Sequence, residues 1–148
     1  MRRVAVILAT CLAWPAGADC VLPEPTPAAA AWQVVEGEEF AFTATSPVYP
    51  GLSVDLATDA PVIPEVLDFV TLPRYGARVG LLQYFSGDPG TSVLVTMVRN
   101  AIIDLATGET LATPVYSLDC VGIPWTWYDD HVEIAEVDGI ERIPLPGR

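Results

Sequence analysis

Short apolar segments separated by turn-forming residues dominate this chain and limit the folds open to it. The clearest case is the Asp-Gly pair at 138–139, which lies between the alternating segments 132–137 and 140–143. Asp-Gly in this position is typical of a two-residue β-hairpin turn. The Pro-Gly pair at 50–51 predicts a type II turn, because proline fixes φ and glycine accepts a positive φ. Gly108 is placed to take the left-handed position of another hairpin loop.

Segments of this kind recur roughly every 8–12 residues, a spacing typical of sandwiches and barrels. The sequence therefore predicts an all-β fold, an antiparallel β-sandwich or small barrel built from hairpins. Strands do not alternate with helices, so a parallel dinucleotide-binding sheet is excluded. Pro114 cannot donate a backbone hydrogen bond, and we expect its strand to be an edge strand or to bulge there.

One segment departs from the strand pattern. In residues 64–72 the apolar residues occur in adjacent pairs, at 66–67 and 69–70, which fits a period of 3.6 better than a period of two. Pro64 suits the first position of a helix, and Pro73 would end it. A short helix is therefore predicted over 64–72, with a fully buried strand as the alternative.

The N-terminus has the three parts of a cleaved secretory signal in order. Arg2 and Arg3 form a positive region, residues 4–14 form an apolar core, and small residues at 16–18 precede the cleavage point. The apolar core is shorter than the roughly 20 residues of a membrane-spanning helix. We predict that residues 1–18 are removed and that the protein is periplasmic or secreted, without membrane insertion afterwards. An N-terminal strand of the fold is the alternative.

Removal of the signal would leave 130 residues, which are enough for one hydrophobic core. Residues 19–31 are rich in Pro and Ala and predict an extended arm, because alternating prolines favour polyproline II geometry. Residues 32–148 are then expected to form a single β-rich domain.

Cysteine usage agrees with export. Cys11 would leave with the signal, so that Cys20 and Cys120 remain. In an oxidising compartment these two predict one disulfide bond, which would join the arm to the domain. Two free, buried thiols are the alternative.

The charge balance is strongly acidic. The chain has 19 Asp and Glu against seven basic residues, all of them Arg, and a net charge of −12. Without Arg2 and Arg3 the net charge would be −14. A chain without a basic cluster cannot neutralise phosphates, which excludes nucleic acid and anionic membrane surfaces as partners. The partner is expected to be an unidentified protein or polysaccharide.

Signatures of catalysis are missing from the sequence. It has no GxSxG, GxxxxGK[ST], HExxH or GxGxxG motif. The absence of Lys excludes Schiff-base chemistry, and a single His cannot build a multi-histidine metal centre. We therefore predict a protein that is not an enzyme and holds no cofactor. An unrecognised hydrolase that uses His131 is the alternative.

Aromatic and ionisable residues concentrate over 125–133. If this segment is extended throughout, alternation places five side chains on one face. These candidate ligand-binding residues are Trp125, Trp127, Asp129, His131 and Glu133. The indoles could stack on sugar rings while the carboxylates accept hydrogen bonds from hydroxyl groups. The carboxylates and imidazole could instead bind a divalent cation.

A structural interpretation of the same residues is favoured. Trp125 and Trp127 would be core residues, Asp129 would lie in a turn, and His131 with Glu133 would lie on a solvated face. The sequence thus predicts a small exported β-domain of the cell envelope that acts by binding or assembly. A polysaccharide- or divalent-cation-binding module that uses the 125–133 face is the first alternative, and a hydrolase is the second.

The charge predicts weak interaction with polyanions. The protein without residues 1–18 is expected to bind neither duplex DNA nor anionic lipid vesicles at physiological salt, because it carries no cationic cluster to release counterions. Fluorescence anisotropy with labelled DNA and vesicle co-sedimentation measure the two interactions. Saturable binding in either assay would contradict the charge argument.

Overall fold

The computed structural model describes residues 20–58, 62–87, 96–136 and 138–146. The predicted signal at 1–18 lies outside these residues. Within these ranges nearly all regular structure is antiparallel β, so the all-β prediction is confirmed, and the helical elements are three short 3₁₀ turns. The turns are η1 (Ala29–Ala31), η2 (Glu38–Phe40) and η3 (Pro73–Tyr75). No helix in the described ranges is long and apolar enough to cross a membrane.

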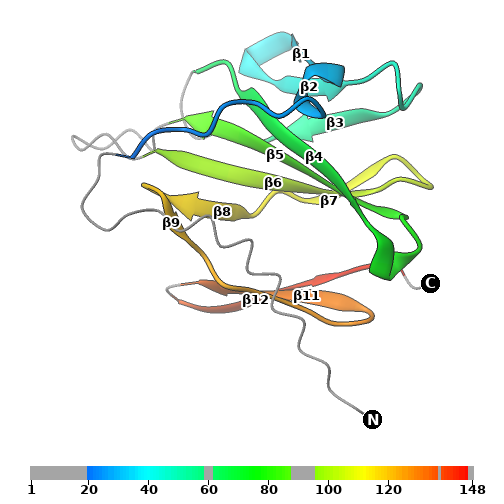
Figure 1. Ribbon diagram of the computed structural model, residues 1–148, viewed down its shortest axis with the longest axis vertical. Helices are drawn as coiled ribbons and strands as arrows, with labels where there is room; N and C mark the ends of the chain where they lie inside the picture. The colour runs from blue at the N-terminus through cyan, green and yellow to red at the C-terminus, as the bar shows by residue number, and fades with distance from the viewer. Residues whose placement is uncertain (1–19, 59–61, 88–95, 137, 147–148) are drawn as a thin grey trace.

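The strands form three sheets (Figure 1). The first sheet has the order β1-β2-β3, and its strands are β1 (Gln33–Glu36), β2 (Phe42–Thr45) and β3 (Ser53–Leu56). The central sheet has the order β4-β5-β6-β8-β9, with β7 also paired to β6. Its strands are β4 (Glu65–Leu72), β5 (Val79–Gly87), β6 (Met97–Asp104), β7 (Glu109–Ala112), β8 (Val115–Leu118) and β9 (Val121–Gly122). The third sheet has the order β10-β11-β12, and its strands are β10 (Trp125–Trp127), β11 (His131–Glu136) and β12 (Gly139–Pro144).

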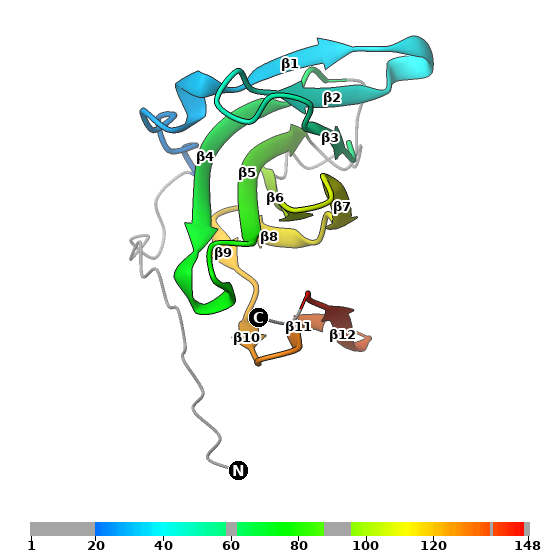
Figure 2. The ribbon, with the colours of Figure 1, turned by 90° about the vertical axis from the view of Figure 1, so that its right-hand side faces the viewer.

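Two hydrophobic cores lie on opposite faces of the central sheet. Each core lies between this sheet and one of the three-stranded sheets, which are on opposite sides of it in Figure 2. The first core joins it to β1–β3 and includes Trp32, Phe42, Val54, Phe69, Leu82, Tyr84, Ala101 and Ile103. The second core joins it to β10–β12 and includes Leu72, Tyr75, Val79, Ile102, Trp127, Val132, Ile134 and Ile143. Successive residues of a strand point to opposite faces, so β6 needs a continuous apolar run at 101–103 to fill both cores.

The helix predicted over residues 64–72 is wrong. This segment is strand β4, which pairs with β5 and has a β-bulge between Val66 and Asp68. A bulge sets two residues against one on the neighbouring strand, which allows Val66 and Leu67 to be buried side by side. Further along, Phe69 fills the first core and Leu72 the second. Because apolar residues lie on both faces of this strand, they occur in adjacent pairs, and this spacing resembles the period of a helix.

The turns predicted at Gly51 and Gly108 are present, whereas the Asp-Gly pair at 138–139 is not the two-residue turn of the last hairpin, because Gly139 lies in a strand. Gly51 has φ of 82°, and the Leu52 N–H donates to the Tyr49 carbonyl (3.1 Å), as the type II turn requires. Gly108 has φ of 77° and its N–H bonds the Asp104 carbonyl (2.8 Å). The last hairpin pairs Glu136 with Gly139, so that this glycine is the first residue of β12.

Pro114 interrupts the strand in which it lies, as predicted. It separates β7 from β8, and both strands pair with β6. The Asn100 N–H donates to the Pro114 carbonyl (3.1 Å), so the backbone remains hydrogen-bonded where the register shifts. The irregularity lies beside Asn100, whose side chain faces the cavity described below.

The predicted disulfide between Cys20 and Cys120 is present, with the two Cα atoms 5.5 Å apart. The segment that follows Cys20 runs to the edge of β4. There the Thr26 N–H bonds the Leu67 carbonyl (2.9 Å) and the Thr26 hydroxyl bonds Asp68 Oδ1 (2.6 Å). Ala29 then enters the first core. The arm is therefore fixed both by the disulfide at its start and by β4 further along.

Reduction is expected to release only the first part of the arm. The denatured, unreduced protein without residues 1–18 should contain no free thiol. Reduction should lower the free energy of unfolding by at most about 4–5 kcal/mol, the chain-entropy value for a loop of about 100 residues. Limited proteolysis with proteinase K should then cut between residues 20 and 26 and leave the remainder folded. Two reactive thiols before reduction, or an oxidised arm that is cut equally fast, would contradict this.

Candidate functional site

The two indoles of the predicted 125–133 face point inward. In the β10–β11 pair, Trp125 lies opposite Ile134 and Trp127 opposite Val132. Cross-strand partners share a face, so both rings lie on the side of the second core. Trp127 is 4% exposed and Trp125 is half-buried. The rings are 5.8 Å apart and form a wall beneath the central sheet.

The ionisable members of the predicted face lie elsewhere. The chain turns at 128–130, where the Tyr128 N–H bonds the His131 carbonyl (2.8 Å), and the alternation of residues 125–127 does not continue through this turn. Glu133 lies opposite Thr126, on the face away from the indoles. Asp129 projects from the turn with its side chain 89% exposed. The five candidate residues therefore do not form one surface. The indoles and Asp129 lie as the structural interpretation expects, whereas the side chains of His131 and Glu133 are only 16% and 19% exposed and not fully solvated.

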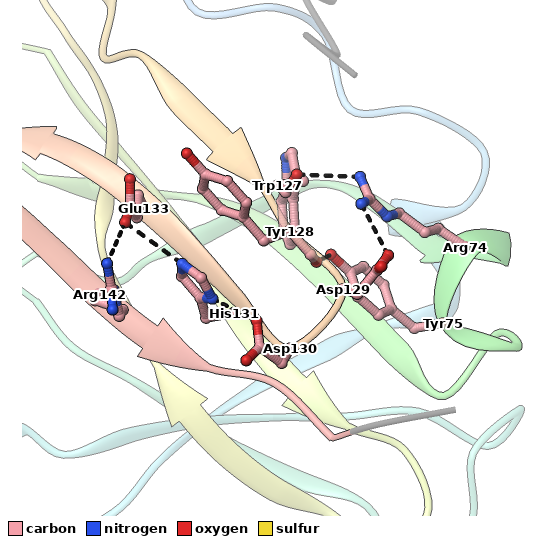
Figure 3. A network of polar contacts seen from close by, with 9 residues as sticks. All are labelled: Arg74, Tyr75, Trp127, Tyr128, Asp129, Asp130, His131, Glu133 and Arg142. Carbon is pink, nitrogen blue, oxygen red and sulfur yellow. Dashed lines mark hydrogen bonds and ion pairs between the residues drawn. The ribbon is translucent and has the colours of Figure 1, made fainter. Parts of the chain in front are cut away.

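A polar network holds this turn against η3 (Figure 3). Arg74 donates to the Trp127 carbonyl (3.1 Å) and to Asp129 Oδ1 (3.0 Å). The Tyr75 hydroxyl donates to the Tyr128 carbonyl. Burial raises the pKa of Tyr75, which keeps this phenol protonated as a donor at neutral pH. The backbone that follows the indoles is thus anchored to the turn after β4.

A second part of the network lies on the outer face of the third sheet. The rings of Tyr128 and His131 stack with their centres 4.5 Å apart. His131 Nδ1 lies 2.6 Å from Asp130 Oδ1, and its Nε2 lies 3.4 Å from Glu133 Oε1. Arg142 donates to the same Glu133 oxygen (2.7 Å). The bond from His131 lowers the pKa of Asp130, whereas the pKa of Glu133 is lowered mainly by Arg142 and to a smaller extent by His131.

The residues that the structure describes contain no group of three or more His, Cys, Asp and Glu side chains arranged to hold a metal ion. Glu133 and His131 are engaged with Arg142 and Asp130 instead. The ion pair between Glu133 and Arg142 joins β11 to β12 on the outer face.

A cavity of about 580 Å³ lies on the inner side of β10. Its roof is the face of the central sheet that carries the second core, with alternate residues of β4, β5 and β6. These roof residues are Asp68, Val70, Leu72, Leu81, Gln83, Val98 and Asn100. Ile123, Pro124, Trp125 and Trp127 form the opposite wall. The disulfide and the arm residues Leu22 and Pro23 also line it.

Two buried polar atoms of the lining have no partner within the described part of the chain. They are Asn100 Oδ1, an acceptor, and Trp125 Nε1, a donor. A buried polar atom without a hydrogen bond costs about 1–3 kcal/mol. Both atoms are covered by protein, although their residues line the cavity. A cavity of this size with mostly apolar walls is the arrangement expected of a small-molecule site. The candidate functional site is therefore this cavity.

The sequence predicted some of the residues that line this cavity. Trp125 and Trp127 were among the predicted ligand-binding residues, whereas Asn100 and Asp68 were not. One signal for Asn100 was present, since it is an amide directly before the apolar run at 101–103 of β6. For Asp68 the prediction of a helix over 64–72 concealed the face on which it lies.

Comparisons of the chain with protein-family models, with curated protein sequences and with solved structures gave no match. Function is therefore argued from the geometry and chemistry of the cavity itself.

Two substitutions separate the causes of the lowered carboxyl pKa values. In His131→Ala, the pKa of Asp130 is expected to rise towards its ordinary value, while that of Glu133 stays lowered because Arg142 remains. In Arg142→Gln, the pKa of Glu133 should rise and that of Asp130 should change little. NMR titration of the side-chain carboxyl carbons measures both groups. An unchanged Asp130 pKa in His131→Ala would contradict the network.

The lowered pKa values of Asp130 and Glu133 determine how the stability of the folded protein changes with pH. Both carboxyl pKa values are lowered in the folded state, so their contribution to stability is complete above about pH 4.5. It is lost as the pH falls through the folded-state pKa values. Denaturant titrations at pH 7 and in steps below pH 4.5 should show a steeper loss of stability for the wild type than for either variant.

Proposed function

We propose that this protein is an exported binding module that holds a small, mostly apolar molecule between its central sheet and strand β10. The observation that carries the proposal is the cavity of about 580 Å³ with mostly apolar walls. Its volume falls within the range of about 300–1,000 Å³ that is usual for small-molecule sites. The signal-like N-terminus and the Cys20–Cys120 disulfide support a place outside the cytoplasm.

A polysaccharide site on the 125–133 face has less support. Stacking on a sugar needs an accessible aromatic surface, whereas Trp127 is buried and Trp125 turns to the cavity. We therefore keep the binding role predicted from the sequence and place the site on the inner side of β10, facing the central sheet.

An uncharged fluorescent probe tests this function. N-phenyl-1-naphthylamine is expected to bind with 1:1 stoichiometry, to emit more strongly in the apolar cavity, and to quench the emission of the two lining indoles by energy transfer. Val70→Phe should weaken its binding at least tenfold. Val70 lines the cavity and is 44% exposed, so a larger side chain can enter the cavity without straining the core.

Val35→Phe is the matched control, because Val35 is also a strand valine, is 48% exposed, and lies on β1 away from the cavity. Its probe affinity should equal that of the wild type. Non-saturable binding, or equal affinity of all three proteins, would sink the proposed function.

A further inference from the structure

A row of polar side chains crosses the apolar roof of the cavity. Asp68 on β4 lies directly opposite Gln83 on β5, and Gln83 lies opposite Asn100 on β6. Direct cross-strand partners share one face of a sheet, with their Cβ atoms about 4.5–5.5 Å apart. All three residues line the cavity, and in the next row Val70 lies opposite Leu81. A polar group of a ligand on this roof is therefore best placed along the row that begins at Asp68.

Two members of this row are accessible to a ligand. Asp68 Oδ1 accepts from the Thr26 hydroxyl (2.6 Å) and from the Phe69 N–H (2.9 Å), which holds the carboxylate in place. Within the described part of the chain, no hydrogen bond engages Asp68 Oδ2 or the side-chain amide of Gln83. These groups are not among the covered polar atoms, whereas Asn100 Oδ1 is. Asp68 and Gln83 are each half-buried, so their remaining polar atoms are open to a ligand.

The charge of the lining is negative. Asp68 is the one charged residue among the described residues that line the cavity, and they include no Arg or His. The whole chain carries a net charge of −12. An anionic ligand would have no counter-ion here, whereas a cation would be paired with the Asp68 carboxylate.

We infer that the ligand of this cavity is an apolar molecule with a primary ammonium group, which donates to Asp68 Oδ2 and to the side-chain carbonyl of Gln83. An ammonium has three N–H donors and no acceptor, so it can bond two neighbouring acceptors at once. Its charge makes the bond to the carboxylate stronger than a bond between neutral groups. This inference rests on the proposed function, since it names the ligand class of the same cavity.

The apolar part of the ligand has surfaces to pack against beside this pair. Asp68 lies on the edge strand of the central sheet, so the ammonium would be held at the margin of the roof. Val70 and Leu81 on the roof, and Ile123 and Trp125 on the opposite wall, keep part of their surface accessible. An aliphatic chain buried against these residues supplies the rest of the affinity.

A series of compounds with one apolar chain and different head groups tests the inference. Octylamine, octanol, octanoate and octyltrimethylammonium are each added at pH 7 and physiological salt, and their displacement of N-phenyl-1-naphthylamine is measured. Octylamine is expected to bind at least tenfold more tightly than octanol or octanoate, and more tightly than octyltrimethylammonium, which has the charge without N–H donors. Octanol or octyltrimethylammonium binding as tightly as octylamine would overturn the inference.

Asp68→Asn tests the carboxylate. This substitution removes the charge and keeps an oxygen that can accept from the Thr26 hydroxyl. It is expected to reduce the preference for octylamine over octanol at least tenfold. Asp55→Asn is the matched control, because Asp55 is an exposed strand aspartate on β3 and lies outside the cavity lining. The control should keep the wild-type preference; an equal loss in both variants would reflect the overall negative charge and would contradict a role for Asp68.

Gln83→Leu tests the second acceptor. It is expected to reduce the preference for octylamine over octanol about threefold, less than Asp68→Asn does, because a neutral acceptor forms the weaker bond. Gln33→Leu is its control, since Gln33 is an exposed strand glutamine on β1 outside the cavity lining. The wild-type preference in Gln83→Leu would refute the assignment of this acceptor.

The outcomes separate the two proposals. Probe binding that is blocked by Val70→Phe, without a preference for octylamine, would overturn the ligand class and leave the binding function standing. Absence of saturable binding of both the probe and the octyl compounds would overturn the proposed function itself. Should Asp68→Asn fail to fold, the four octyl compounds on the wild-type protein and the Gln83→Leu variant decide the result.

Discussion

Burial of the central strands on both faces is the constraint on which the other parts of the structure depend. On β6, Ala101 and Ile103 fill the first core, and Ile102 between them fills the second. Neighbouring side chains on a strand point in opposite directions, so a continuous apolar run is stable only if each face has a cover. The two three-stranded sheets provide these covers (Figure 2). The two three-stranded sheets need the central sheet in turn, because a small sheet is only marginally stable unless one of its faces is packed.

The cavity lies where the third sheet, β10–β12, does not pack directly against the central sheet. Strand β10 has only three residues. Trp127 packs in the second core, whereas Trp125 is half-buried and lines the cavity together with the disulfide. The wall keeps its position because Arg74 and Tyr75 bind the backbone carbonyls of Trp127 and Tyr128. At the other side, the disulfide and the Thr26–Asp68 bond place the arm against the lining. Residues from both ends of the chain thus enclose one space.

The site predicted from the sequence was wrong because the prediction assumed one unbroken strand over residues 125–133. Residues 125, 127, 129, 131 and 133 share one face only in an unbroken strand, and the turn at 128–130 interrupts the alternation. The indoles and the ionisable residues were therefore assigned to one face, although they lie on opposite sides of the third sheet. Asn100 is 25 residues from Trp125 in the chain. No local pattern relates the two, because their proximity depends on the layering of sheets.

Local rules determined what the sequence could predict by itself. Turn chemistry located the bends at Gly51 and Gly108, since few residues accept a positive φ, and repeated short strands fixed the all-β class. Two cysteines outside the predicted signal left one pairing. Tertiary structure decided the rest. It made 65–72 a strand, because a bulge and covers on both faces give a strand the apolar spacing of a helix. It also created the cavity, because the distance between two sheets is set by packing across the whole layer and not by any segment of the chain.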